Sequence, residues 1–194
     1  MKLLSSMSAI SLALLSTSTL AADVNFTSKL AKGDALVVFQ NVGSDADLKF
    51  LDRDTRKQLQ RAIKTDSFTG KYGKTLELIA PIDSKYSRIV VVGLGESNEL
   101  TAAKMAKLGG NIHAKLEDKK VATVSLAFES VKGKAKNSEL AAQFAHGANL
   151  RDYTFEVYKK EPQTFNVTYN IDVADKKTTS KRYQQLLISN KVYF

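Results

Sequence analysis

Hydrophobic residues along the chain form short segments of two kinds. Some are almost continuously apolar, such as Ala35 to Gln40 (ALVVFQ) and Arg88 to Val92 (RIVVV), which is typical of strands buried on both faces of a sheet. Others alternate apolar and polar residues, as half-exposed strands do. Together they predict six strands, at 24–30, 35–40, 74–79, 88–92, 121–128 and 164–173.

Between these strands, apolar residues recur at steps of three and four. This spacing predicts amphipathic helices, because it places the apolar side chains on one helical face. The expected helices are 45–64, 100–116, 138–149 and 181–191. Strands and helices therefore alternate, which predicts an α/β three-layer sandwich with helices on both faces of a central sheet.

The first 21 residues do not fit this pattern. Lys2 is followed by an uncharged, largely apolar stretch up to Leu20, and Thr19-x-Ala21 offers the small residues that a signal peptidase accepts. We expect a signal peptide at 1–21, cleaved after Ala21 or one residue later. An uncleaved membrane anchor is the alternative, but serines and threonines interrupt the stretch. The product is then an exported protein, periplasmic or secreted, with no stable membrane anchor.

Composition narrows the possible chemistry. The 194 residues include no cysteine, which excludes disulfides, cysteine nucleophiles and thiolate metal sites. The net charge of +9 permits attraction to polyanions. Five cations, at Arg53, Arg56, Lys57, Arg61 and Lys64, form one possible basic stripe. A solvated helix face explains them as well, and export makes nucleic acid an unlikely partner.

Gly93-Leu94-Gly95 follows a buried strand and precedes a helix, which is where dinucleotide-binding loops occur. The motif is incomplete, since Asn98 replaces the third glycine, Glu96 is acidic and no P-loop lysine follows. A tight turn between strand and helix also explains the glycines. We retain Gly93, Leu94 and Gly95 as a possible turn beside a ligand crevice.

Other candidate residues give weaker signals. His113 and His146 each stand in a predicted helix without a second ligand at metal-binding spacing, so we expect them to be structural or exposed. The pairs Asp45-x-Asp47 and Asp52-x-Asp54 are better explained as a solvated helix face than as a hard-metal cluster. No serine or threonine stands in a recognisable nucleophile motif.

The order of segments resembles a known family. Residues 88–95 (RIVVVGLG), 99–110 (ELTAAKMAKLGG), 139–147 (ELAAQFAHG) and 151–159 (RDYTFEVYK) together resemble the amino-terminal domain of the leucyl aminopeptidase (cytosol aminopeptidase) family. The resemblance implies a macro-domain-like fold with a mixed central sheet. It also implies that catalysis belongs to a separate carboxy-terminal domain, where lysine, aspartate and glutamate hold two divalent metals.

The hallmark segments of that catalytic domain do not occur in residues 1–194. We therefore expect no catalytic, metal or cofactor-binding residue in this chain. The predicted organisation is a signal peptide at 1–21, the aminopeptidase amino-terminal-like domain at 22–175 and a truncated linking helix at 176–194.

The expected function is that of a noncatalytic domain of an exported leucyl-aminopeptidase-like protein, with a role in assembly or regulation. Its expected partners are a catalytic domain or like subunits in a homo-oligomer. The alternative is a free-standing exported macro-like module that binds a small ligand at the Gly93 turn.

Overall fold

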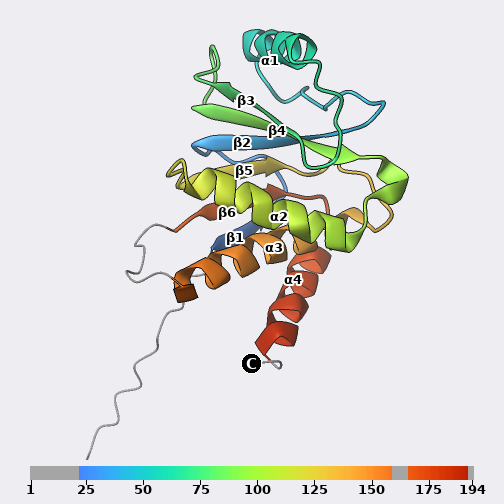
Figure 1. Ribbon diagram of the computed structural model, residues 1–194, viewed down its shortest axis with the longest axis vertical. Coiled ribbons are helices and arrows are strands. Elements are labelled where there is room, and N and C mark those ends of the chain that lie inside the picture. The colour runs from blue at the N-terminus through green and yellow to red at the C-terminus, as the bar shows by residue number, and fades with distance from the viewer. Residues whose placement is uncertain (1–21, 159–165, 192–194) are drawn as a thin grey trace, which may run out of the picture.

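The computed structural model describes residues 22–158 and 166–191, so the predicted signal peptide lies outside the described residues. These described residues form six strands interspersed with four α-helices (Figure 1). The strands are β1 (Asp23–Thr27), β2 (Ala35–Asn41), β3 (Thr75–Ile79), β4 (Arg88–Gly95), β5 (Thr123–Ala127) and β6 (Thr168–Asp172). The α-helices are α1 (Arg53–Thr65), α2 (Ala102–Glu117), α3 (Asn137–Tyr158) and α4 (Lys176–Lys191), and a short 3-10 helix, η1 (Ser97–Glu99), precedes α2.

The strands form one mixed sheet in the order β1-β6-β5-β2-β4-β3. All neighbouring strands run parallel except β3, which runs antiparallel to β4. β2 and β4 lie inside the sheet and are almost completely buried, as their continuous apolar sequences predict. The predicted fold class, an α/β sandwich with a mixed sheet, is confirmed.

Helices cover the two faces of the sheet unequally. α2, α3 and α4 contribute to a large core on one face, together with Val37, Phe39, Val90 and Val92. On the other face, Leu59 of α1 packs with Leu48, Leu51 and alternate residues of β2 and β4. In Figure 1, α1 lies beyond β3 at one end of the sheet, whereas α4 lies beside β1 at the other. No helix among the described residues is long and apolar enough to cross a membrane.

Close packing of α2 against α3 depends on glycine. A Cβ atom added to Gly109 would lie 2.0 Å from the carbonyl oxygen of Phe144, and one added to Gly147 would lie 1.8 Å from that of Ala106. Side chains at these two positions would therefore force the helices apart.

Several boundaries differ from the sequence prediction. α3 runs to Tyr158 instead of ending at residue 149, and β1 ends at Thr27 instead of residue 30. α1 begins at Arg53 rather than at residue 45, because Leu48 and Leu51 are buried in the core and the Arg56 guanidinium bonds the carbonyl oxygens of Lys49 and Leu51. β4 runs through the glycines to Gly95 instead of ending at Val92.

α4 begins directly after Asp175, five residues earlier than the spacing of apolar residues predicts. The Asp175 carboxylate accepts a hydrogen bond from the Thr178 backbone N–H at 3.0 Å. This is the interaction of a helix N-cap, which satisfies one of the free N–H groups of the first turn.

Candidate functional site

The Gly93-Leu94-Gly95 segment is the end of β4, and residues 70–74 lie directly against it. The N–H of Gly93 donates to the carbonyl oxygen of Lys74 at 2.8 Å, and that of Gly95 donates to Gly70 at 2.9 Å. A Cβ atom at Gly93 would lie 2.1 Å from the carbonyl oxygen of Lys71. Glycine is therefore required here for close backbone approach, and the N–H groups of both glycines are already paired within the chain.

The N-terminus of α2, which follows this segment, is also capped from within the chain. The Thr101 hydroxyl accepts a hydrogen bond from the Lys104 N–H at 3.2 Å. The Lys104 ammonium pairs with Glu99 at 3.3 Å and lies 5.5 Å from the centre of the Tyr72 ring. These contacts explain why a strand, two glycines and a helix occur in succession here without forming a phosphate-binding loop.

The structure brings His113 into a buried polar cluster that the sequence did not predict. Its Nδ1 lies 3.0 Å from the Tyr169 hydroxyl, and its Nε2 lies 3.3 Å from Oδ1 of Asp152 and 4.0 Å from Glu117. Burial is the largest of the effects that raise the pKa of Tyr169, followed by the negative charges of Asp152 and Glu117.

His113 and Tyr169 are both fully buried. The cluster joins α2, α3 and β6 in the interior, and its histidine and tyrosine are closed to solvent. We therefore assign it a structural role, which agrees with the sequence-based expectation for His113.

His146 of α3 is also nearly buried, at 7% exposure, on the side of the helix near Arg182. Burial lowers its pKa, and the positive charge of Arg182 lowers it further. A neutral imidazole is thus favoured in the folded protein.

The described residues do not fit the two-metal centre of an aminopeptidase. They contain no group of three or more histidine, aspartate or glutamate side chains arranged to hold a metal ion. The aspartates that the sequence singled out are separated: Asp52 precedes α1 as its N-cap residue, Asp54 lies in the first turn and Asp47 accepts a hydrogen bond from the Lys49 N–H.

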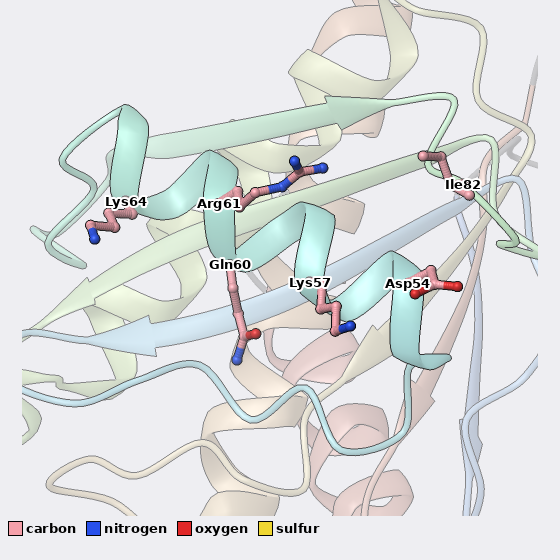
Figure 2. A pocket seen from close by; sticks show the side chains of 6 residues that line it. All are labelled: Asp54, Lys57, Gln60, Arg61, Lys64 and Ile82. Atoms are coloured by element: carbon pink, nitrogen blue, oxygen red, sulfur yellow. The ribbon is translucent and has the colours of Figure 1, made fainter.

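The basic stripe of α1 exists in part. The side chains of Lys57, Arg61 and Lys64 line one side of a shallow hollow of about 700 Å³, with Asp54 and Ile82 at its end (Figure 2). Arg56 does not join them, because its guanidinium is bound to the carbonyl oxygens of Lys49 and Leu51. The residues that line the hollow are exposed and half of them are cationic, so it could attract anions but offers no reacting group.

A two-fold hydrogen-bonded ion pair and an aromatic contact hold α4 to the rest of the fold. The Arg182 guanidinium makes two hydrogen bonds to the Glu139 carboxylate of α3, at 2.5 and 3.0 Å. Arg182 is the main cause of the lowered pKa of Glu139. On the same helix, the Tyr183 ring meets Phe26 of β1 edge to face at 5.8 Å. α4 is thus held by both α3 and β1, and these two contacts fix its orientation relative to the sheet.

Comparison with known proteins relates the chain to one enzyme family. A family model described as the N-terminal domain of the cytosol aminopeptidase family matches residues 35–162. Probable cytosol aminopeptidase 1 of Shewanella oneidensis is 34% identical over 155 residues, covering 79% of this chain and 30% of the relative. A probable cytosol aminopeptidase of Rickettsia bellii is 30% identical over 181 residues, covering 88% and 36%. The chain thus spans about a third of the length of these relatives.

Solved structures show the same fold. A mutant of tomato leucine aminopeptidase matches with a TM-score of 0.60 at 15% identity, over 88% of this chain and 36% of that one. A macrodomain from Oceanobacillus iheyensis with MES bound matches with a TM-score of 0.58 at 10% identity, over 88% and 92%. The macro-domain-like fold expected from the sequence is confirmed.

Proposed function

Because the chain belongs to the cytosol aminopeptidase family through its N-terminal domain, we propose that these residues form a noncatalytic domain of an exported protein of that family. It acts through protein contacts, in assembly or regulation, and does not itself remove amino-terminal residues. The observation that carries this proposal is that residues 35–162 match the N-terminal domain of the family.

The chemistry of the described residues supports a noncatalytic role. Hydrolysis in this family is expected to need two divalent metals that activate water. The carboxylates of Glu117 and Asp152 lie beside His113 in the interior, where both His113 and Tyr169 are at 0% exposure. A peptide substrate therefore cannot contact either ring in the folded domain.

The attachment of α4 supports a role in assembly. In this position the sequence predicts a helix that links to a catalytic domain, and the structure holds that helix firmly through Glu139, Arg182 and Tyr183. A rigid helix fixes the orientation of whatever partner follows or packs against it. This is a positioning task and requires no reacting group.

Two measurements test the proposal. The purified chain is assayed for hydrolysis of leucine amide with added Mn²⁺ or Zn²⁺, beside a complete family enzyme as the positive control. We expect no turnover above the metal-only blank, and substantial metal-dependent turnover would overturn the noncatalytic role. Cell fractionation with N-terminal sequencing tests export, for which we expect a processed chain beginning at Ala22 or Asp23. An unprocessed cytoplasmic chain would contradict it.

A further inference from the structure

β1 is the outermost strand on one side of the sheet, and no strand of residues 22–158 or 166–191 pairs with its outer edge. The Asp23 N–H donates to the Val167 carbonyl at 3.2 Å, and the Thr27 carbonyl accepts from the Val173 N–H at 2.9 Å. The odd-numbered residues of β1 therefore face β6. Because backbone groups alternate in direction along a strand, the N–H and C=O groups of Val24 and Phe26 point away from the sheet.

The opposite edge of the sheet is protected against pairing, whereas β1 is not. β3 is followed by Pro81, and its Glu77 forms ion pairs with Arg88 and Lys119. Proline and charged side chains are the usual means of blocking an edge strand. β1, with the sequence DVNFT, has no proline, lysine or arginine, and its register with β6 shows no bulge.

A groove runs along the open edge of β1. It has a volume of about 480 Å³ and lies between Val24, Asn25 and Phe26 on one side and Lys176, Lys177, Ser180, Tyr183 and Gln184 of α4 on the other. Its floor is partly apolar, since Phe26 and Tyr183 meet there. An added strand would bury this surface.

We propose that the β1 edge pairs antiparallel with β1 of a second copy of this chain, around a two-fold axis at Asn25. The inference rests on the assembly role proposed above, and it supplies the surface and the partner for that role. Pairing on this axis places Val24 opposite Phe26 and Asp23 opposite Thr27, with Asn25 opposite its own counterpart.

The sequence of β1 suits this pairing. Val24 and Phe26 carry the outward backbone groups, so each exchanges both hydrogen bonds with the other residue of the second copy. A β-branched residue then faces an aromatic one, two amides face each other and no like charges are opposed, which are favourable cross-strand pairs. The two sheets become one continuous sheet across the axis, in the isologous arrangement common to homodimers.

A charged residue introduced at Asn25, on the two-fold axis, tests the pairing through electrostatic repulsion. Asn25→Lys places two ammonium groups opposite each other in the dimer, whereas the monomer tolerates it because Asn25 is exposed and its bond to Asn170 is long, at 3.4 Å. Asn98→Lys, on an exposed residue of η1, is the matched control with the same change in charge.

The association constant is measured by sedimentation velocity across a concentration series. The protein used is the chain purified after any processing in the cell. We expect the wild type and Asn98→Lys to dimerise alike, and Asn25→Lys to associate at least about tenfold more weakly. Circular dichroism confirms that each variant folds.

A cysteine at the axis tests the register. The chain has no cysteine of its own, so a disulfide in a single-cysteine variant must join two copies. Residues opposed at the axis form a non-hydrogen-bonded pair with Cα atoms about 4.5 Å apart, within the range of a disulfide. With oxidised glutathione, Asn25→Cys is expected to form a covalent dimer much faster than Asn98→Cys.

The outcomes separate the two proposals. A chain that is monomeric at every concentration, or a dimer that is unaffected by Asn25→Lys and not captured by Asn25→Cys, overturns the β1 pairing. A dimer formed through another surface would overturn the pairing and leave the assembly role standing. Metal-dependent hydrolysis of leucine amide would overturn the noncatalytic role whatever the state of the β1 edge.

Discussion

Replacing Gly147 by alanine should destabilise the domain, although alanine is the better helix former. The added Cβ would lie 1.8 Å from the carbonyl oxygen of Ala106, with the carbonyl carbon at 2.6 Å. Ordinary contacts between such atoms begin near about 3.5 Å, so α2 and α3 must separate locally by roughly 1.5 Å. A gap of this size removes much of the dispersion attraction between the two helices.

The magnitude follows from two opposing effects. Overpacking a tight interior typically costs about 1–3 kcal/mol, and the strict backbone contact here places the cost at the upper end. Exchanging glycine for alanine within a helix returns about 1 kcal/mol. We expect a net loss of about 2 kcal/mol, which in a chain of this size lowers the melting temperature by about 4–8 °C.

Gly110→Ala is the matched control, because it makes the same exchange in the same helix pair. Its Cβ would lie 3.2 Å from the carbonyl oxygen of Gly147, so a shift of a few tenths of an ångström accommodates it. This variant should be as stable as the wild type or more stable by up to about 1 kcal/mol. Urea titration with a common m-value measures both variants. A Gly147→Ala variant at least as stable as the wild type would refute the close approach of the helices.

Three further predictions follow from buried polar groups and a helix cap. Burial and the charge of Arg182 lower the pKa of His146 in the folded state, so the stability that depends on its neutral form is present above about pH 6.5 and is lost as the pH falls through the lowered folded pKa. His146→Gln should therefore flatten the decline in unfolding free energy below neutral pH; an unchanged slope would contradict this. Tyr169→Phe removes the hydroxyl beside Nδ1 of His113 and should cost about 1–3 kcal/mol in urea titrations, whereas a neutral result would mean that this contact contributes nothing. Thr101→Ala removes the N-cap of α2 and should cost about 1 kcal/mol, with Thr101→Ser, which keeps the hydroxyl, close to the wild type.

Sequence patterns located the helices and strands whose burial leaves a clear signal within a few neighbouring residues. The apolar runs of β2 and β4 located both strands, because strands buried on both faces leave a continuous pattern. The start of α1 was wrong because Leu48 and Leu51 follow a helical spacing while packing as an irregular segment. The start of α4 is marked in the sequence by the capping residue Asp175, but the prediction used only the apolar residues and so began the helix too late.

The candidate site was harder to predict because its contacts are distant in sequence. Gly93 was predicted to lie in a tight turn, but it lies within β4, and it needs glycine because Lys71 passes beside it, which no local pattern shows. In the His113 cluster, only Glu117 lies at helical spacing from the histidine. Asp152 and Tyr169 come from other elements and meet it only in the folded sheet and helices.

The position of β1 has a consequence for how the protein is made. Asn25 of β1 and its neighbour Asn170 of β6 are separated by 145 residues, and the described residues give β1 no other strand to pair with. The first strand to leave the ribosome must therefore wait until β6 has been synthesised. A ribosome that stalls between β5 and β6 would release a polypeptide whose central strands can associate while its first strand has no place in the sheet. The sheet can thus be completed only after β6 has emerged.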